Sequence, residues 1–171
     1  LFDPTAFALA TSHKNKPFVR MVLLKLILKD GYVFFTNLES KKGKHFLDNN
    51  NLSMCFYWEA INKQIRIIGK GEVVDSKVSD DYFSSRPRGS QIGAWASKQS
   101  TVLSSKKQLL EREKVYKKRF EGMNVPRPDY WVGIKIIPKE FEFWQQGDYR
   151  LHERESYTLK KNAWEKKILS P

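Results

Sequence analysis

The chain has 171 residues, of which 40% are hydrophobic and 13% aromatic, so it is long and apolar enough to bury a core. Lys and Arg number 31 against 19 Asp and Glu, and the net charge of +12 favours anionic partners. No run of about 18 apolar residues is present, so we expect no transmembrane helix and no membrane partner. The opening residues LFDPTAFALATSHKNK lack signal-peptide features, and because they begin at Leu1 we expect an upstream segment to be absent.

Cysteine and histidine usage narrows the possible chemistry. The single cysteine, Cys55, cannot form an intrachain disulfide, so we expect a reducing compartment and a cytoplasmic protein. We interpret it as a small buried hydrophobe rather than a catalytic thiol. The three histidines are scattered without a partner at metal-ligand spacing, so we expect no metal site; they are His13, His45 and His152.

The first half of the chain predicts short strands separated by turns. These strands are Ala6–Ser12, Phe18–Leu28, Tyr32–Thr36, Leu52–Trp58 and Lys63–Val74. Lys29-Asp30-Gly31 predicts a tight hairpin turn, and Ser40 predicts the N-cap of a short helix that ends near Asn49. Gly69 and Gly71 indicate a bend or a close backbone approach in the fifth strand.

The second half predicts helices followed by strands. Asp75 or Ser76 is expected to cap a helix that Pro87 ends, and Ser104–Phe120 is expected to be the longest helix. Its apolar stripe is more typical of core than of a partner groove, and comprises Val102, Leu109, Tyr116 and Phe120. The remaining predicted strands are Trp131–Ile137, Phe141–Gln145, Leu151–Leu159 and Ala163–Leu169. The whole pattern predicts one α+β, mainly β domain over 1–171, a barrel of antiparallel strands with inserted helices.

Two cationic stretches lie within predicted strands. In RLHER, the alternation of a strand places Arg150, His152 and Arg154 on one face without an acid between them. That face is expected to bind a phosphate or carboxylate, although salt bridges to acids on neighbouring strands are the alternative. In RMVLLK, Arg20 and Lys25 fall on opposite faces unless a bulge intervenes.

A third polar stretch, SRPRGSQIGAWASKQS, covers Ser85 to Ser100. Its Arg, Ser and Gln side chains can hold a phosphate without a glycine-rich loop, which by composition alone is a weak signal. We expect IGAWA at its centre to form a short packed helical turn that fixes the spacing of the two ends.

Motifs along nearly the whole chain resemble those of the pyridoxamine 5′-phosphate oxidase family. The matching stretches are RMVLLK, VFFTN, SKKGK, FYWE with NKQIRIIGK, SRPRGSQIGAWASKQS, EFWQQGDYRLHER and the closing W with LSP. The resemblance implies an FMN-binding split β-barrel that works as a homodimer, with FMN between the subunits. It also implies oxidation of pyridoxamine 5′-phosphate and pyridoxine 5′-phosphate to pyridoxal 5′-phosphate, with oxygen as acceptor and hydrogen peroxide as product.

The resemblance also implies which residues form the site. The implied FMN contacts are Arg20, Met21, Val22, Leu23, Leu24, Lys25, Phe35, Thr36, Lys41, Lys42, Gln64, Gln99, Ser100, Trp144 and Arg154. The implied substrate contacts are Lys25, Tyr82, Arg86, Ser90, Arg150, Leu151 and His152. The implied catalytic residues are Arg150, His152 and Asp3, with Asp3 in a segment that aligns across a gap. The family usually has arginine where this chain has Lys41, which keeps the charge and loses the forked geometry.

Two other functions remain open from the sequence. A related split-barrel flavoprotein would bind FMN and act on another substrate, but Tyr82, Arg86 and Ser90 keep the oxidase pattern. A basic nucleic-acid-binding protein would expose aromatic side chains among lysines and arginines, whereas the aromatics here fall mostly in predicted strands. We therefore expect no nucleic-acid partner.

Overall fold

The computed structural model describes residues 2–171 and confirms the α+β, mainly β fold class. The strands are β1 (Ala6–His13), β2 (Lys16–Leu23), β3 (Leu26–Leu28), β4 (Gly31–Asn37), β5 (Asn51–Trp58), β6 (Lys63–Val73), β7 (Trp131–Gln145), β8 (Glu153–Lys160) and β9 (Ala163–Ile168). The helices are α1 (Lys41–Asp48), α2 (Ser76–Ser85), α3 (Arg88–Ala96) and α4 (Lys106–Arg119), with 3₁₀ turns η1 (Glu59–Ile61) and η2 (Asp148–Arg150).

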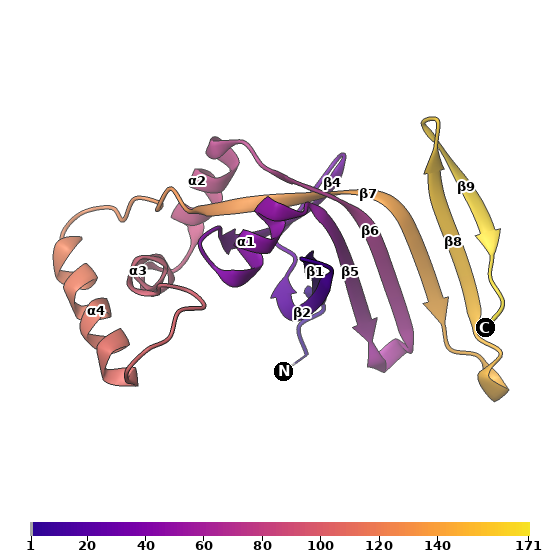
Figure 1. Cartoon of the computed structure of the whole chain (residues 1–171), viewed down its shortest axis with the longest axis horizontal. Helices are drawn as coiled ribbons and strands as arrows, with labels where there is room; N and C mark the ends of the chain where they lie inside the picture. Colours follow the sequence, from indigo (N-terminus) through magenta and orange to yellow (C-terminus); the bar gives the residue numbers. More distant parts are fainter. Residues whose placement is uncertain (1) are drawn as a thin grey trace.

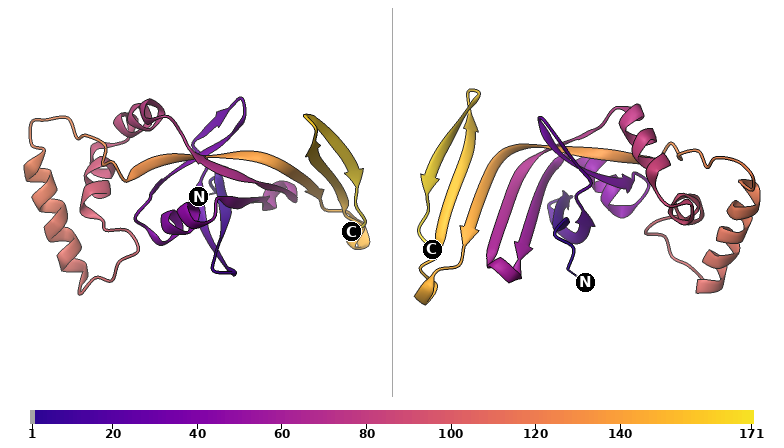
Figure 2. Two further views of the ribbon diagram at one scale, coloured as in Figure 1. Left: turned by 45° about the horizontal axis from the view of Figure 1, so that its top comes forward. Right: turned by 180° about the vertical axis from the view of Figure 1, so that it is seen from behind.

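The strands form one antiparallel sheet in the order β2-β1-β5-β6-β7-β4-β3, with β8 on the far half of β7 and β9 beside β8. Strand β7 is the longest element and runs along most of the molecule (Figure 1). Its first half pairs with β4 and its second half with β8, while β6 pairs along both halves. As a result α2, α3 and α4 gather at one end of the molecule and the β8–β9 hairpin lies at the other (Figures 1 and 2).

Two expected strand assignments differ from the structure. The expected strand Phe18–Leu28 is two strands, because the chain leaves the β1 pairing after Leu23 and the Lys25 backbone N–H donates to the Val33 carbonyl instead. The expected strands on either side of Pro138 are one continuous strand, β7. The register between β6 and β7 shifts at Ile68/Gly69, opposite Pro138, so the strand accommodates a proline without ending.

The glycine prediction in β6 is confirmed by close contacts. A Cβ atom on Gly69 would lie 2.1 Å from the Ile137 carbonyl oxygen, and one on Gly71 would lie 2.7 Å from side-chain atoms of Leu52 and Phe46. Both positions therefore need glycine for a close approach, at the backbone of β7 and at the core respectively.

Two hydrophobic clusters hold the fold. The larger lies between the sheet and α1 and includes Phe7, Leu9, Phe34 and Met54. The smaller joins α2, α3 and α4 to the start of β7 and includes Phe83, Ile92, Phe120 and Trp131. Within the predicted α4 stripe, Phe120 is core and Tyr116 packs against it, but Val102 is 96% exposed because it precedes the helix. Cys55 is half-buried rather than fully buried.

Within residues 2–171, no helix is both long and apolar enough to cross a membrane.

Candidate functional site

A cavity of about 640 Å³ opens between β2, β4, α2 and α3, and we call it the basic cavity. Twelve of the residues that the sequence assigns to cofactor or substrate line it: Arg20, Met21, Val22, Leu23, Lys25, Phe35, Thr36, Lys42, Tyr82, Arg86, Ser90 and Gln99. The lining is completed by residues that the motifs did not single out, namely Asn37, Gly93, Ala94, Ser97 and Trp131.

The break between β2 and β3 explains how two cations reach the same cavity. Continuous strand alternation would send Arg20 and Lys25 to opposite faces of the sheet. Because β2 ends at Leu23, the chain turns before Lys25 and both residues line the cavity. The prediction of opposite faces allowed a bulge as the exception, and the structure has a strand break there instead.

Arg86 lies at the junction of α2 and α3, over the face of Trp131, with 4.7 Å from its guanidinium carbon to the ring centroid. Burial lowers the pKa of Arg86. Its Nη1 atom is buried and has no hydrogen-bond partner among the described residues. A buried guanidinium donor without a partner is costly, so this position is built to receive an acceptor atom from a ligand.

Gln91 fixes the backbone that carries Arg86, and sequence reasoning missed it. Its Nε2 atom donates to the backbone carbonyls of Phe83, Ser84 and Arg86, at 3.1, 3.0 and 3.0 Å. These carbonyls lie at the C-terminal end of α2, where the last carbonyls of a helix lack intrahelical donors, although that of Phe83 also accepts from the Arg86 backbone N–H at 3.2 Å. A buried glutamine inside SRPRGSQ was the available signal, because a buried amide needs several backbone partners.

Lys42 enters the cavity from the first turn of α1, which Ser40 caps by accepting from the Gly43 backbone N–H. The Lys42 Nζ atom donates to Oε1 of Gln99 at 2.8 Å. Burial, together with the nearby positive charge of Arg20, lowers the pKa of Lys42 to about 8. Across the cavity, the Thr36 hydroxyl is buried and makes no hydrogen bond within the described chain.

The electrostatics of the cavity favour a bound anion. Four of its lining residues are cationic, namely Arg20, Lys25, Lys42 and Arg86, and none of the lining residues in the described chain is a carboxylate. Like charges gathered in a partly buried space repel one another and lower one another's affinity for protons, as at Lys42. A phosphate group would remove this cost and supply acceptors for the unpaired donors.

A flat aromatic stack forms one wall. The rings of Phe35 and Tyr82 lie 4.0 Å apart and 5° from parallel, and Phe35 in turn lies 5.0 Å from Trp131. Burial raises the pKa of the Tyr82 hydroxyl, so this group is a hydrogen-bond donor at neutral pH.

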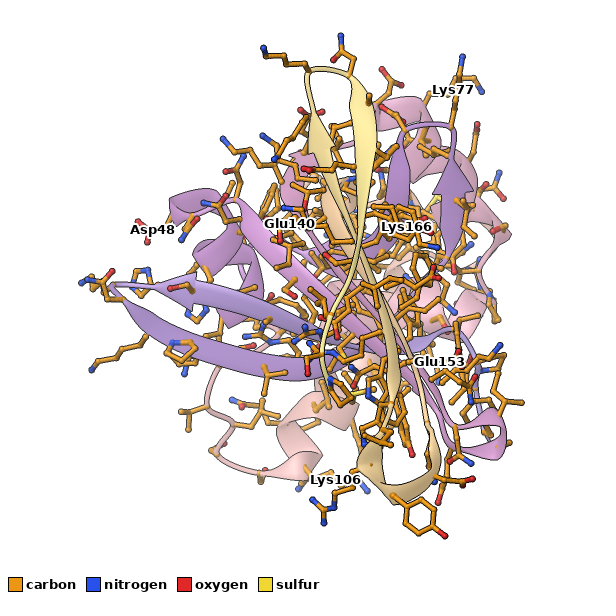
Figure 3. All side chains as sticks on the ribbon, turned by 90° about the vertical axis from the view of Figure 1, so that its right-hand side faces the viewer. Asp48, Lys77, Lys106, Glu140, Glu153 and Lys166 are labelled. Atoms are coloured by element: carbon orange, nitrogen blue, oxygen red, sulfur yellow. The ribbon has the colours of Figure 1, made fainter. Side chains whose placement is uncertain are left out.

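Six other predicted residues gather at the opposite end of β7, in a group we call the β7–β8 cluster: Gln64, Trp144, Arg150, Leu151, His152 and Arg154. Gln64 and Trp144 pair across β6 and β7 and line a second cavity of about 340 Å³. Glu153, labelled in Figure 3, lines the same cavity at the base of the β8–β9 hairpin. Within one chain, the two predicted halves of the site are therefore separate.

The prediction that Arg150, His152 and Arg154 share one strand face is wrong. Strand β8 begins at Glu153, and Arg150 belongs to η2 with φ at 67°, in the left-handed region. His152 packs against Trp144 at 4.7 Å between ring centroids, and its Nδ1 accepts from the Gly147 backbone N–H at 3.3 Å. The neutral ring therefore carries its proton on Nε2, where it can donate to a ligand.

For Arg154 the alternative prediction is confirmed: its guanidinium forms a salt bridge with an acid on the neighbouring strand. Its Nε atom donates to Glu142 at 3.0 Å and its Nη1 atom to the Ser170 carbonyl at 2.8 Å. Arg66 donates to the other carboxylate oxygen of Glu142. Burial alone would raise the pKa of Glu142, but the hydrogen bonds from the two arginines outweigh it and lower the pKa.

Four predicted residues lie outside both the basic cavity and the β7–β8 cluster. Leu24 packs against the main core, Lys41 is exposed with its Nζ 4.5 Å from the Phe18 ring centroid, and Ser100 is exposed at a φ of 69°. Asp3 is exposed, and the hydrogen bonds from the Thr5 side chain and backbone lower its pKa.

Comparisons with known proteins agree along the whole chain. The family profile described as "Pyridoxamine 5′-phosphate oxidase" matches residues 1–121, and that described as "Pyridoxine 5′-phosphate oxidase C-terminal dimerisation region" matches residues 131–171. The chain is 50% identical to pyridoxine/pyridoxamine 5′-phosphate oxidase of Pelagibacter ubique, covering all of this chain and 84% of the relative. It is 47% identical to the protein of the same name from Ehrlichia chaffeensis, over 96% of this chain and 83% of the relative.

Solved structures give the same fold. PhzG from Burkholderia lata 383, solved in complex with tetrahydrophenazine-1-carboxylic acid, superposes with a TM-score of 0.92 at 29% identity, over 98% of this chain and 83% of that chain. A pyridoxamine 5′-phosphate oxidase-related, FMN-binding protein from Nostoc punctiforme superposes with a TM-score of 0.79 at 13% identity, over 98% and 89%. The second likeness shows the fold alone, and this fold is the expected split barrel.

Proposed function

This chain belongs to the pyridoxamine 5′-phosphate oxidase family, and we propose that its basic cavity binds FMN and the phosphate of a B6 vitamer, with the β7–β8 cluster completing the site. As a member of that family it is an oxidase that converts pyridoxine and pyridoxamine 5′-phosphates to pyridoxal 5′-phosphate. The observation that carries the proposal is a set of four cations, three of them partly buried, with an unpaired guanidinium donor and no lining carboxylate among residues 2–171.

The residues of the cavity fit FMN. The cavity volume of about 640 Å³ suits a cofactor of this size, since ligand pockets run from about 300 to 1,000 Å³. Arg20 and Lys42 lie close enough for Arg20 to lower the Lys42 pKa, so we assign this pair to the FMN phosphate. The unpaired Thr36 hydroxyl supplies a further hydrogen-bonding group to the cofactor.

The substrate phosphate is assigned to the other end of the cavity. Arg86 offers its unpaired Nη1, and Lys25 and Ser90 line the same space. Tyr82 donates its hydroxyl proton from the aromatic wall. These residues bind and orient the substrate, which is where the protein contributes most when a cofactor carries the chemistry.

The β7–β8 cluster is assigned to the reacting ring. FMN supplies, when bound, the acceptor for the hydride that leaves the C4′ carbon of the substrate, and oxygen then takes up the electrons as hydrogen peroxide. His152 presents an Nε2 proton because Gly147 holds its Nδ1 as an acceptor. Arg150 and Leu151 cover the ring and exclude water, while Gln64 and Trp144 lie along the flavin. We also assign Asp3 to the catalytic residues beside the β7–β8 cluster.

We assign the two halves of each site to different subunits of a homodimer. The two halves lie apart within one chain, and residues 131–171 match a dimerisation region. Apolar side chains beside the basic cavity are strongly exposed, with Val19 at 70% and Met21 at 65%, as is Leu151 in the cluster at 70%. Covering such a surface favours association with a second copy.

The decisive experiment combines flavin binding with peroxide release. Purified protein given FMN is expected to show bound-flavin absorbance and to release peroxide with either pyridoxine 5′-phosphate or pyridoxamine 5′-phosphate. A preparation that gains no flavin bands would contradict FMN binding. Bound FMN without peroxide from either vitamer would instead indicate a related flavoprotein acting on another substrate.

A further inference from the structure

A chain of hydrogen-bonded side chains lies behind Arg20, outside the basic cavity. The Arg20 Nη1 atom donates to the Leu9 carbonyl at 3.0 Å, to the Thr11 hydroxyl at 2.8 Å and to the Phe18 carbonyl at 3.2 Å. All three acceptors belong to the β1–β2 hairpin. One nitrogen of the guanidinium is thus held from behind, while the side chain lines the cavity.

Thr11 also forms a hydrogen bond with His45. Thr11 is 3% exposed, and its hydroxyl lies 3.2 Å from Nδ1 of His45, which is 4% exposed. Because the Thr11 oxygen accepts from Arg20, its single proton is free to be donated to His45. In this assignment Nδ1 of His45 accepts, and the neutral ring carries its proton on Nε2.

The surroundings of His45 keep it neutral. Burial lowers its pKa, and the positive charges of His13, Arg20 and Lys41 lower it further, while Asp48 has the opposite effect. The ring stacks against His13 at 5.1 Å and 3° from parallel, and it contacts Phe18 at 4.3 Å. His13 pairs with Asp48 at 2.8 Å, and Asp48 is labelled beside the tip of the β1–β2 hairpin in Figure 3.

This arrangement joins the two elements that supply cations to one end of the cavity. His45 lies on α1, the helix that also presents Lys42, and Arg20 lies on β2. The Thr11–His45 hydrogen bond therefore ties α1 to the strand pair at the level of Arg20. Neither Thr11 nor His45 lines the cavity, so neither can touch a ligand there.

We propose that Thr11 and His45 are positioning residues that hold Arg20 and α1 in place and so set the affinity of the cavity for the phosphate of FMN. The inference rests on the proposed function, because it places that phosphate at Arg20. Without the Thr11 hydroxyl, a guanidinium N–H and the His45 Nδ1 atom lose their shared partner in a buried place. Arg20 would then shift toward its two remaining acceptors, the Leu9 and Phe18 carbonyls.

The test compares FMN with riboflavin, which has the same ring and no phosphate. The variants are Thr11→Val, which keeps the shape and removes the hydroxyl, and Thr11→Ser, which restores it. His45→Phe and His45→Asn form the second pair, since asparagine keeps an acceptor near the place of Nδ1. Dissociation constants are measured by flavin fluorescence on apoprotein, with the melting temperature of each apoprotein as a check on folding.

We expect Thr11→Val and His45→Phe to weaken FMN binding about tenfold, as the loss of a hydrogen bond to a charged group would, and to leave riboflavin binding within about twofold. Thr11→Ser and His45→Asn are expected to bind FMN nearly as wild type does. Wild-type affinity for FMN in both Thr11→Val and His45→Phe would overturn the inference, as would equal weakening of both flavins. If Thr11→Val does not fold, the His45 pair decides. Wild-type protein that binds neither flavin would overturn the proposed function itself.

Discussion

The basic cavity and the β7–β8 cluster differ in how far a single chain completes them. In the cavity, Arg86 and Thr36 keep buried polar atoms without a partner in the described chain, and the lining from that part of the chain holds four cations and no carboxylate. In the cluster, Arg154 is already neutralised by Glu142. The first region is therefore prepared for anions before any ligand arrives, whereas the charge of Arg154 is largely satisfied within the chain.

The two regions also differ in exposure. Arg86 is partly buried over Trp131, while Tyr149 is 94% exposed beside Arg150, and both Tyr149 and Arg150 have positive φ. Such backbone positions persist only where the surroundings hold them. This difference agrees with the proposal that the cavity is the binding half of each site and that the cluster of a second subunit covers it.

The largest expected effect is on the KM for substrate, which should depend on Arg86 and not on its neighbour Arg88. Arg86→Ala is expected to raise the KM for either phosphorylated vitamer by about 100-fold or more, because a charge-assisted contact to the substrate phosphate is lost. FMN should stay bound, which flavin absorbance after gel filtration would check. Loss of FMN would show that Arg86 holds the other phosphate.

Arg88→Ala is the matched control for this change. Arg88 donates to the carbonyls of Phe120 and Met123 at the end of α4 and does not line the basic cavity. We expect a lower melting temperature with KM nearly unchanged. A large rise in KM for Arg88→Ala would mean that the helix pair, and not the Arg86 guanidinium, determines substrate binding.

Mixed dimers test whether the two regions of one site come from two chains. Arg86→Ala damages the cavity and His152→Ala damages the cluster, so each variant alone is expected to be nearly inactive at a substrate concentration near the wild-type KM. If the sites are shared, a heterodimer of the two has one undamaged site. Random mixing after co-refolding should then restore about a quarter of wild-type activity.

The readout is peroxide release from differently tagged, co-purified heterodimers. Dimers mixed from wild type and the double variant Arg86→Ala/His152→Ala provide the control. If the sites are shared, each of the two sites in that heterodimer contains one substituted residue and should be inactive. Activity in the control heterodimer, with none in the first, would place both halves of the site in one chain.

A substitution at Glu142 tests how much its ion pairs with Arg66 and Arg154 stabilise the β7–β8 cluster. Glu142→Gln is expected to lower the free energy of unfolding by about 1–3 kcal/mol, because Arg66 and Arg154 lose their common charged partner while both remain partly exposed to solvent. The pKa of Glu142 is lowered from its ordinary value of 4.5, so its stabilising effect is present above pH 4.5 and is lost as the pH falls through the lower folded value. The stability difference between wild type and variant, from urea unfolding, should therefore shrink below pH 4.5. A difference that stays constant with pH would show that packing, not charge, is responsible.

The sequence was sufficient for the fold class and for most, but not all, of the lining of the basic cavity. Alternation, turn residues and the family motifs predicted most strands and twelve of the lining residues. Residues that contact a phosphate can be predicted from family motifs, because only certain residue types can bind a phosphate. Gln91 was marked only by its place inside SRPRGSQ, and Thr11 and His45 had no sequence signal, since the role of all three lies in hydrogen bonds that only the tertiary structure reveals.

The errors of the sequence reading have a common cause. RMVLLK and RLHER were read with the two-residue period of a strand, but β2 ends inside the first and β8 begins inside the second. Where pairing stops, the alternation rule fails, and these are the places where Lys25, Arg150 and His152 are found. Functional side chains near strand ends are thus the hardest to place from periodicity alone.

The smallest expected effect is a pH dependence of the cavity. The Lys42 pKa is about 8 because of burial and the charge of Arg20, so in the free protein Lys42 loses its proton as the pH rises above 8. A bound phosphate favours the charged form, and FMN binding at higher pH must therefore take up a proton. The FMN dissociation constant should rise above pH 8 by at most about tenfold per pH unit, while that of riboflavin should not follow it. Lys42→Arg keeps its charge throughout this range and should flatten the FMN profile. If the FMN dissociation constant of Lys42→Arg rises with pH as it does in wild type, a different group is responsible for the titration. The assignment of the FMN phosphate to a place beside Lys42 would then lose its support.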